Sequence, residues 1–302
     1  MTASMPAVEP RVVVITGASS GIGRETALRY AARRDRLVLA SRTESMLQEV
    51  AGECLAAGAR DVLVHPTDIG EADEVQRLFD VALDAFGRVD VAVQCAAVTA
   101  FGRFEDLPAE VFERIIRTNL IGAANVARCA LGHFQGRGSG HLVLVGSLLG
   151  RVAVPYQSAY VASKFALNGL VRSLRQENRR QPGVRVHGVY PGPVDTPVYD
   201  TSVNYLEHTP RVPPSADAPA TVARVIVGET DRERSTERHV GWVNVPAIIA
   251  YHLLPGVFDA LVGPLVRATL FTTDKGGPRP GRRLPRRRDR RRLTPHGGHS
   301  AV

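Results

Sequence analysis

The chain has 302 residues, of which 44% are hydrophobic and 23% are charged, so it is long enough for one large globular domain with a substantial core. Its net charge of +8 comes from residues 279–292, which hold nine arginines and one aspartate. Since the rest of the chain sums to zero, the body has no overall electrostatic bias toward nucleic acid, and no specific nucleic-acid partner is expected.

The chain contains three cysteines, Cys54, Cys95 and Cys129. Their number is odd, and their spacing fits neither a metal site nor a C-x-x-C pair, so no metal is expected and a reducing compartment is indicated. The first ten residues lack the charged start and apolar run of a secretory signal. We therefore expect a cytoplasmic protein, with peripheral attachment to a membrane as the alternative.

Short aliphatic runs alternate with amphipathic stretches from residue 11 onward, which is typical of β-α-β units in a parallel sheet. Strands are expected over residues 12–16, 37–40, 62–65, 89–94, 141–146, 185–190 and 238–243. Helices are expected over residues 23–33, 43–57, 72–86, 109–134 and 158–179. The pattern predicts an α/β protein with a doubly wound, mostly parallel seven-stranded sheet between two helical layers, the Rossmann fold.

The predicted organisation has four parts. These are a flexible N-terminus at 1–10, the Rossmann domain at 11–245, an apolar C-terminal extension at 246–275 and a disordered tail rich in Arg, Pro and Gly at 276–302. Within the domain, residues 199–214 contain prolines and scattered aromatics without clear periodicity, which predicts a loop or short helices over a site.

The first predicted strand runs directly into a glycine-rich turn, Thr16 to Gly23, that opens a helix. Backbone at such a turn can approach a pyrophosphate closely, and the free N–H groups and helix dipole favour its negative charge. The spacing Gly-x-x-x-Gly-x-Gly differs from the generic G-x-G-x-x-G fingerprint, and a tight loop without a ligand is the alternative; the strand-turn-helix context favours a dinucleotide site. The residues expected to contact the cofactor here are Gly17, Ser19, Ser20, Gly21, Ile22 and Gly23.

The second predicted strand is followed by Ser41 and Arg42, at the place where a protein selective for NAD has an acidic residue against the ribose 2′-hydroxyl. A carboxylate would repel a 2′-phosphate, whereas a hydroxyl and a guanidinium can bind it through charge-assisted hydrogen bonds. We therefore expect NADP(H) as the cofactor, with Ser41 and Arg42 among its ligands. The alternative is an ordinary surface arginine in an arginine-rich chain.

Tyr160 and Lys164 lie four residues apart in a predicted helix, so they share one helix face. A nearby ammonium stabilises a phenolate and moves the pKa of tyrosine toward neutral pH, where a phenol can act as an acid/base catalyst. The chain has two lysines, Lys164 and Lys275, and uses arginine nearly everywhere else. A lysine kept in that background indicates a need for a compact ammonium.

Ser147 and Asn119 are two further candidates for the catalytic site. Ser147 follows a predicted strand, which places its hydroxyl at the carboxyl edge of the sheet, where open α/β sheets bind ligands and where it can polarise a substrate oxygen. A helix cap or a turn is the alternative role. Asn119 lies inside a predicted helix, where asparagine usually marks exposure or a kink.

From about residue 10 to residue 245 the chain resembles the classical short-chain dehydrogenase/reductase family. The residues that carry the resemblance, in order, are TGASSGIG at 16–23, Asp68, Asn119, Ser147, the Tyr160/Lys164 pair, Pro191-Gly192, Val194 and Thr196. The resemblance implies an oxidoreductase in which Tyr160 is the acid/base, Lys164 lowers its pKa and holds the nicotinamide ribose, Ser147 orients the substrate oxygen, and Asn119 supports a water-linked proton path to Lys164.

The resemblance also implies where the rest of the cofactor is contacted. Asp68 and Ile69 are expected on the adenine side, and the expected nicotinamide-side residues are Pro191, Gly192, Val194 and Thr196. A homodimer or homotetramer is implied as the assembly.

One motif departs from the family pattern. After the fourth strand the family usually has Asn-Asn-Ala-Gly, whereas this chain has Gln94-Cys95-Ala96-Ala97. We expect Cys95, Ala96 and Ala97 to contact the cofactor, with altered affinity, because Ala97 adds a methyl group and a thiol is a poorer hydrogen-bond partner than an amide. Cys95 is either a buried structural thiol or a redox sensor, and the first is favoured.

The expected pocket walls are residues 98–101, Leu148, Leu149, 152–156 and 199–206, which are mainly apolar. They favour a hydrophobic carbonyl or alcohol as the small-molecule substrate. The intact Tyr160/Lys164 pair favours an active enzyme over two alternatives: a non-catalytic NADP(H)-binding redox sensor, supported by the altered motif, and a nucleic-acid or membrane adaptor that uses the arginine-rich tail.

The apolar stretch at residues 246–271 is interrupted by polar and proline residues, so it does not predict a membrane span. It is longer than the family core needs. It has three open roles: to cover the substrate entrance, to lie on a membrane surface with help from the arginines of the tail, or to pack at a subunit contact. A solvated tail without a partner is favoured over tail-driven attachment.

Overall fold

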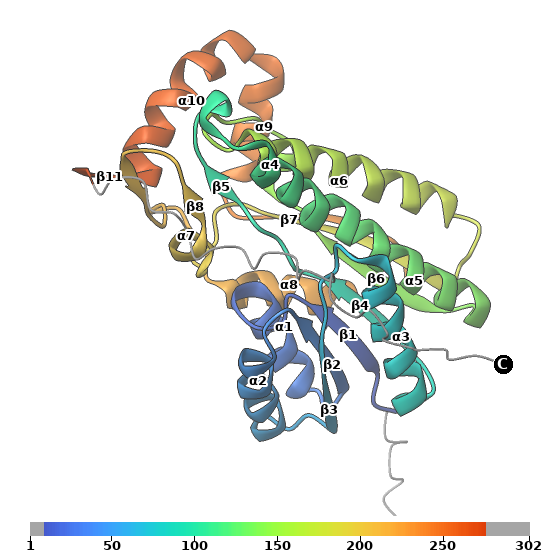
Figure 1. Cartoon of the computed structure of the whole chain (residues 1–302). Helices are drawn as coiled ribbons and strands as arrows, with labels where there is room; N and C mark the ends of the chain where they lie inside the picture. Colours follow the sequence, from blue (N-terminus) through green and yellow to red (C-terminus); the bar gives the residue numbers. More distant parts are fainter. Residues whose placement is uncertain (1–8, 276–302) are drawn as a thin grey trace, which may run out of the picture.

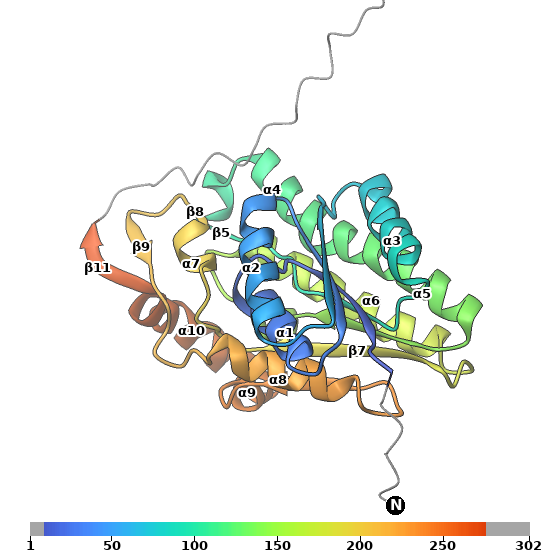
Figure 2. The ribbon, with the colours of Figure 1, turned by 90° about the horizontal axis from the view of Figure 1, so that it is seen from below.

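The computed structural model describes residues 9–275 and contains a parallel sheet between two helical layers (Figure 1, Figure 2). The strands lie in the order β10-β7-β6-β4-β1-β2-β3, and every neighbouring pair is parallel. Their bounds are β1 Val12–Thr16, β2 Arg36–Ser41, β3 Asp61–Pro66, β4 Val91–Gln94, β6 Gly140–Val145, β7 Val184–Pro191 and β10 Glu237–Val240. The predicted seven-stranded Rossmann fold is confirmed. The tail predicted to be disordered and residues 1–8 of the predicted flexible N-terminus lie outside the described residues.

Helices cover both faces of the sheet because successive residues of a strand point to opposite sides. In β1, Val13 and Ile15 belong to the core under α1 (Gly21–Ala31), α2 (Glu44–Ala56) and α8 (Pro219–Glu229). Val14, between them, belongs to the core under α3 (Ala72–Phe86), α5 (Gly122–Arg137) and α6 (Ser158–Glu177). Both cores are built from buried aliphatic side chains, which is what a parallel sheet needs on each face.

The helix expected over residues 109–134 is interrupted. α4 (Ala109–Ile116) leads into a π-helical turn, Arg117–Ile121, before α5 continues. A π turn adds one residue to the helical turn and is often found at functional sites. Here it contains Asn119, which is fully buried. The expectation that an asparagine at this place means exposure or a kink is therefore half right, since the helix is disturbed but the side chain faces inward.

The chain after β7 differs most from the expectations. The loop expected over residues 199–214 holds a short helix, α7 (Val198–Thr201), as foreseen, and also two unforeseen strands, β8 (Val203–Asn204) and β9 (His208–Pro210). β8 pairs with β5 (Ala100–Phe101), which follows β4. The last sheet strand, β10, ends at Val240, before the expected residue 243, because Gly241 has a φ of +109° and turns the chain.

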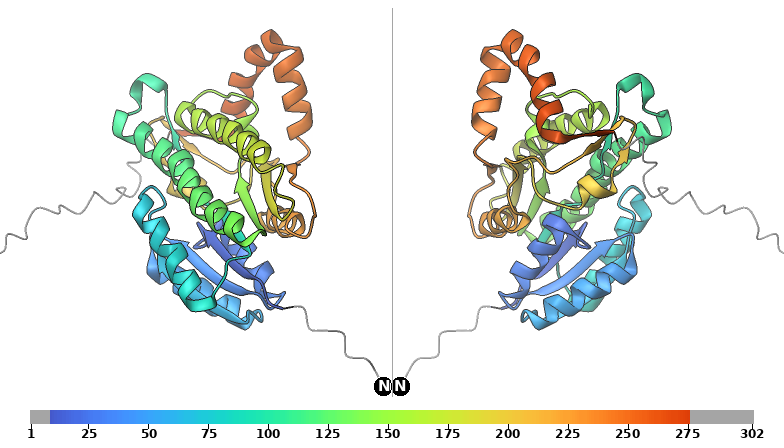
Figure 3. Two further views of the ribbon diagram at one scale, coloured as in Figure 1. Left: turned by 90° about the vertical axis from the view of Figure 1, so that its right-hand side faces the viewer. Right: turned by 90° about the vertical axis from the view of Figure 1, so that its left-hand side faces the viewer.

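Residues 244–270 form two helices, α9 (Asn244–Leu253) and α10 (Pro255–Leu270), here termed the C-terminal hairpin, which projects from one end of the described structure (Figure 3). α10 contains Pro264 in its interior. β11 (Phe271–Lys275) follows and pairs antiparallel with β9, so the end of the hairpin is fixed to the segment after α7. Between residues 9 and 275, no helix is long and apolar enough to cross a membrane.

Candidate active site

A cavity of about 780 Å³ lies at the carboxyl ends of the sheet strands. Residues that directly follow six strands line it, because the carboxyl ends of parallel strands meet at one edge of the sheet. Every residue expected to bind the cofactor lines this cavity: Gly17, Ser19, Ser20, Gly21, Ile22, Gly23, Ser41, Arg42, Asp68, Ile69, Cys95, Ala96, Ala97, Tyr160, Lys164, Pro191, Gly192, Val194 and Thr196. Ser147 lines it too, whereas Asn119 lies behind its wall.

The glycine-rich turn is packed so tightly that Gly17 and Gly23 have no room for a side chain. A Cβ atom on Gly17 would lie 2.6 Å from the backbone nitrogen of Ala96, and one on Gly23 would lie 2.1 Å from the carbonyl oxygen of Gly17. Gly17 and Gly21 also have φ values of +72° and +52°, which favour glycine. The N-terminus of α1 therefore faces the cavity across bare backbone, an arrangement that fits the pyrophosphate of a dinucleotide.

Ser41 and Arg42 lie at the end of β2 and line the same cavity. Arg42 is exposed, so its guanidinium can reach a ligand without losing its hydration. Among the described residues that line the cavity, Asp68 is the sole carboxylate, and its Oδ1 accepts a hydrogen bond from the backbone of Gly70 at 2.9 Å. Ser41 and Arg42 thus present a hydroxyl and a guanidinium at this end of the cavity.

Ser147 follows β6 and begins the short 3₁₀ helix Leu148–Gly150. Its backbone is extended, and its Oγ accepts a hydrogen bond from the backbone nitrogen of Leu149 at 3.1 Å. This bond is a helix cap, so both roles considered from the sequence meet in one residue. The cap uses only an acceptor site of the hydroxyl, so its proton can be donated to Tyr160 or to a ligand in the cavity.

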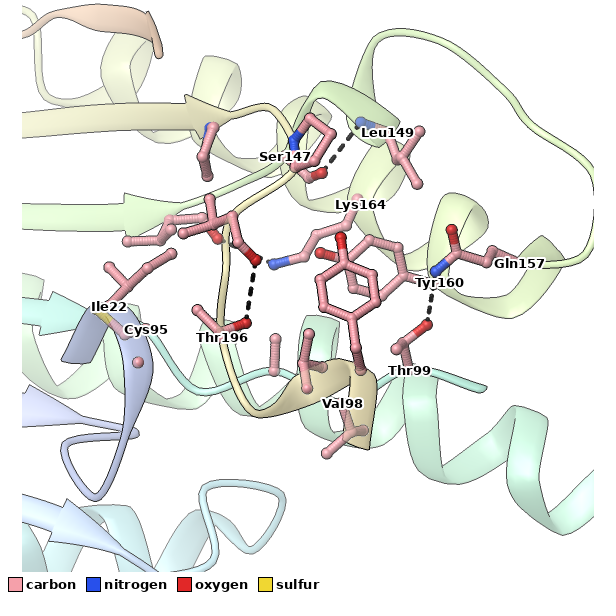
Figure 4. Close-up of a pocket in the computed structure, with 18 of the residues that line it drawn as sticks. Ile22, Cys95, Val98, Thr99, Ser147, Leu149, Gln157, Tyr160, Lys164 and Thr196 are labelled. Carbon is pink, nitrogen blue, oxygen red and sulfur yellow. Dashed lines mark hydrogen bonds between the residues drawn. The ribbon is translucent and has the colours of Figure 1, made fainter. Parts of the chain in front are cut away.

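Tyr160 and Lys164 lie on one face of α6 and both line the cavity (Figure 4). The Lys164 side chain is buried, and its Nζ donates a hydrogen bond to the Val145 carbonyl oxygen at 3.0 Å. Nζ lies 5.6 Å from the centroid of the Tyr160 ring. The β6 carbonyl therefore holds the ammonium beside the phenol, at the point where Ser147 enters the cavity.

Burial controls the proton affinity of both groups. It raises the pKa of Tyr160 above its ordinary value of 10.0, and hydrogen bonding with Ser147 opposes this rise. It lowers the pKa of Lys164 to about 8, since a buried ammonium loses hydration. The family resemblance implies that Lys164 lowers the pKa of Tyr160, but in this geometry the desolvation of the phenol is the larger effect.

Asn119 joins α6 to the segment that follows β4. Its Oδ1 accepts a hydrogen bond from the backbone nitrogen of Val98 at 2.8 Å, and its Nδ2 donates to the carbonyl oxygen of Val98 at 2.9 Å and to Ser163 Oγ at 3.0 Å. Ser163 Oγ in turn donates to the Tyr160 carbonyl oxygen at 2.7 Å. Asn119 therefore positions both the cavity wall at Val98 and the backbone of the tyrosine.

The altered motif after β4 fits the fold without a positive φ angle at any of its residues. Positive φ values among the described non-glycine residues occur at Arg34 and Tyr156, so Ala97 adopts an ordinary backbone conformation. Burial raises the pKa of the Cys95 thiol to about 12, with Lys164 opposing the rise. A neutral thiol is a weak nucleophile, which favours a structural over a redox role for Cys95.

The C-terminal hairpin closes one side of the cavity, which agrees with the first of the three roles that the sequence left open for residues 246–271. Its lining residues, with those just before it, are Trp242, Val243, Ala247, Phe258, Val262, Leu265, Val266, Thr269 and Leu270. The i, i+4 spacing of Phe258, Val262 and Val266 is the signal that could have revealed the inner face of α10, but Pro255 and Pro264 concealed the helix.

About half of the expected apolar wall lines the cavity, nine of the nineteen expected residues. The expected residues that line the cavity are Val98, Thr99, Phe101, Leu148, Leu149, Val152, Val154, Tyr199 and Thr201. Tyr205 and Leu206 do not line it, although they belong to the expected range. They pack instead into two small cores, one with Val111 of α4 and one with Val266 of α10, because the β5–β8 pairing turns that segment away from the cavity.

Comparisons with known proteins give a consistent result. A family model described as short chain dehydrogenase matches residues 11–205. YxnA, an uncharacterized oxidoreductase of Bacillus subtilis, is 38% identical over 205 residues, which are 67% of this chain and 57% of that protein. The chain thus spans less than two thirds of the length of this relative.

Two solved structures are similar over most of their length. A short-chain dehydrogenase/reductase from Burkholderia phymatum, in complex with NAD, has a TM-score of 0.73 and 28% identity over 86% of this chain and 97% of that chain. An alcohol dehydrogenase from the archaeon Thermococcus sibiricus, complexed with 5-hydroxy-NADP, has a TM-score of 0.68 and 29% identity over 78% of this chain and 98% of that chain. Both of these proteins hold a nicotinamide dinucleotide.

Proposed function

We propose that this chain, which belongs to the short-chain dehydrogenase family, transfers a hydride between NADP(H) and the carbonyl or secondary alcohol carbon of a hydrophobic substrate. One observation carries the proposal. Tyr160, Lys164 and Ser147 meet in the cavity that is also bounded by the bare backbone of the glycine-rich turn. An acid/base group and a dinucleotide cradle in one cavity are what hydride transfer to a carbonyl requires.

Each side chain of the site has its own role in the reaction at the substrate oxygen. When bound, the nicotinamide supplies or accepts the hydride. Tyr160 Oη gives a proton to the oxygen during reduction and takes it back during oxidation, and the Ser147 hydroxyl donates a hydrogen bond to the same oxygen. The Lys164 ammonium, fixed by the Val145 carbonyl, stabilises the phenolate that remains. Asn119 keeps Tyr160 and Val98 in place.

The cofactor preference is proposed from Arg42 and Ser41. The expected result is a higher catalytic efficiency with NADPH than with NADH, since a guanidinium at this place binds a 2′-phosphate. Arg42→Ala should raise KM for NADPH by about tenfold and leave KM for NADH nearly unchanged. Arg34→Ala, another exposed arginine, is the control. A wild-type protein that prefers NADH would contradict the proposal.

The substrate class follows from the cavity wall. Apart from the cofactor residues, the wall consists mainly of aliphatic and aromatic side chains, contributed by the segment after β4, the 3₁₀ helix after Ser147 and the C-terminal hairpin. Such a wall favours a bulky apolar ketone or secondary alcohol. Activity confined to sugars or charged acids would remove the basis for this part of the proposal.

The decisive experiment follows NADPH absorbance with a panel of ketones. Tyr160→Phe should reduce kcat by about 10²-fold to 10⁴-fold, because it removes the proton donor while keeping the ring. NADPH affinity, measured by fluorescence titration, should stay within a few-fold of wild type. Tight NADPH binding by the wild type without turnover on any ketone or alcohol would favour the redox sensor instead.

A further inference from the structure

The exposed surface of the C-terminal hairpin is unusually apolar. Of the fourteen large hydrophobic side chains that are exposed in the described part of the chain, eight lie between residues 242 and 265. They are 52% to 76% exposed: Trp242, Val245, Ile249, Leu253, Leu254, Val257, Leu261 and Leu265. A concentration of this kind marks a surface that binds something apolar.

These side chains follow the geometry of the two helices. In α9 the exposed residues Val245, Ile249 and Leu253 recur every four positions, and in α10 Val257, Leu261 and Leu265 do the same. The cavity-lining stripe of α10, at Phe258, Val262 and Val266, lies one residue further along each time. α10 is therefore apolar toward the cavity and toward solvent.

Charged groups are scarce on the hairpin. Residues 242–270 contain one acidic residue, Asp259, and one arginine, Arg267. Arg267 is engaged near the base, where its Nε donates to Tyr156 Oη at 2.7 Å. Arg211 donates to the carbonyl oxygens of Ala268 and Thr269 at the end of α10. The hairpin is thus held at its base, and the turn between α9 and α10 projects outward (Figure 1). Leu253 and Leu254, where α9 ends and before α10 begins, are exposed.

The arginine run identifies the chemistry of the partner. Residues 279–292 carry nine arginines and one aspartate, and Arg279 is four positions after Lys275. Four residues span at most about 14 Å, so the run begins close to where the described structure ends. An apolar surface that is followed in the chain by a strongly cationic segment matches a bilayer with anionic headgroups. A second copy of the chain would bring two such cationic segments together, which opposes a symmetric contact there.

We propose that the C-terminal hairpin docks on a membrane that contains anionic lipids. The exposed side chains of α9 and α10 enter the headgroup region, and the arginines of residues 279–292 bind lipid phosphates. Two signals, one apolar and one electrostatic, are the usual requirement for stable peripheral attachment. The proposal goes beyond the proposed oxidoreductase function and does not depend on turnover.

The test uses the full chain and vesicles of phosphatidylcholine, alone or mixed with phosphatidylglycerol. Trp242 is the one tryptophan in the sequence, lies two residues before α9 and is 76% exposed, so its emission reports on the base of the hairpin. Mixed vesicles should shift this emission to shorter wavelength and carry the protein into the pellet. Pure phosphatidylcholine should bind it much less, and added salt should weaken binding to the mixed vesicles.

Three variants separate the two signals. Leu253→Ser combined with Leu261→Ser should lower the partition coefficient by roughly tenfold. Leu55→Ser, a similarly exposed leucine on α2, should bind as wild type does. A chain ending at Lys275 should bind pure and mixed vesicles equally. The proposal is overturned if wild type binds neither vesicle or if the double variant binds as tightly as wild type. It is also overturned if the double substitution alters the oligomeric state in solution and leaves vesicle binding unchanged.

Discussion

Lys164 is a buried lysine in a chain that otherwise uses arginine, and the need for a compact ammonium beside Tyr160 explains both facts. Arginine occupies nearly all other basic positions, yet this buried place beside Tyr160 and the Val145 carbonyl holds a lysine. A guanidinium is larger and planar, and it keeps its charge at any accessible pH. The ammonium at this site, in contrast, has a pKa lowered to about 8 and so changes charge just above neutrality.

This titration predicts a pH dependence of catalysis. The kcat/KM for NADPH, which reports groups of the free enzyme, should fall as pH rises through about 8, because Lys164 loses the proton that makes it a cation. Burial raises the pKa of Tyr160, so the fall is assigned to Lys164. In Lys164→Arg the cation persists, so the decline should move to higher pH even where the rate is lower. A decline near pH 8 that survives in this variant would assign it to another group.

At the scale of single residues, sequence reasoning placed the chemistry well and the environment less well. The positions of Tyr160, Lys164 and Ser147 on one cavity follow from helix periodicity and from the geometry of parallel strands, both of which are local rules. The setting of Asn119 does not follow, because the π turn that carries it depends on contacts with Val98 and Ser163, far away in the sequence.

Among the elements, the strand-turn-helix unit β1–α1 has the least freedom. Gly23 packs against the Gly17 carbonyl, so α1 can start close to the cavity only if both residues lack side chains. The same helix buries Ala27 and Tyr30 against the sheet. The turn is therefore fixed at both ends, and the backbone N–H groups at the start of α1 are presented in one orientation.

A glycine substitution tests this constraint. Gly23→Ala should weaken NADPH binding by at least about tenfold, since its Cβ would need backbone movement to avoid the Gly17 carbonyl. Gly52→Ala, in the interior of α2 with open space around it, is the matched control. It should leave binding unchanged and raise stability by up to about 1 kcal/mol, since alanine is the better helix former. Calorimetric titration and thermal unfolding measure both effects, and equal affinity of the two variants would refute the constraint.

The elements that sequence patterns failed to predict fall into two groups, each with its own physical reason. α8 begins with Pro219, α10 begins with Pro255, and α10 also contains Pro264. Proline is well tolerated in the first turn of a helix, but inside a pattern it resembles a break. β5, β8, β9 and β11 were missed because strands of two to five residues carry almost no periodicity and depend on their partners.

At the scale of the whole molecule, ion pairs join the N-terminal part of the sheet domain to its C-terminal part. Asp231, which follows α8, forms ion pairs with Arg11 at 2.7 Å and Arg33 at 2.8 Å. Hydrogen bonding with Arg33, followed by that with Arg11, lowers the pKa of this carboxyl to about 2. These bonds join the first strand and first helix to a segment 220 residues away from Arg11.

Acid titration should reveal the contribution of this cluster. Because the folded-state pKa of Asp231 lies below its ordinary value of 3.8, the stabilisation is complete above that value and is lost as pH falls toward about 2. Asp231→Asn should therefore be less stable than wild type at neutral pH, by less than about 1 kcal/mol since the pair is partly exposed, and the gap should close in acid. Urea unfolding at both pH values measures it, with exposed Asp84→Asn as the control. A gap that stays constant with pH would mean that charge is not its origin.

The pairing of α1 with α8 also has a consequence for the order of events at the ribosome. Tyr30 Oη lies 2.9 Å from Thr230 Oγ1, across 200 residues of sequence. At roughly 5–20 residues per second, the inner face of the first helix waits about 10–40 s for its neighbour to be translated. During that interval a growing chain exposes the apolar side of β1–α1 to solvent. Such an exposed apolar surface is what a chaperone binds.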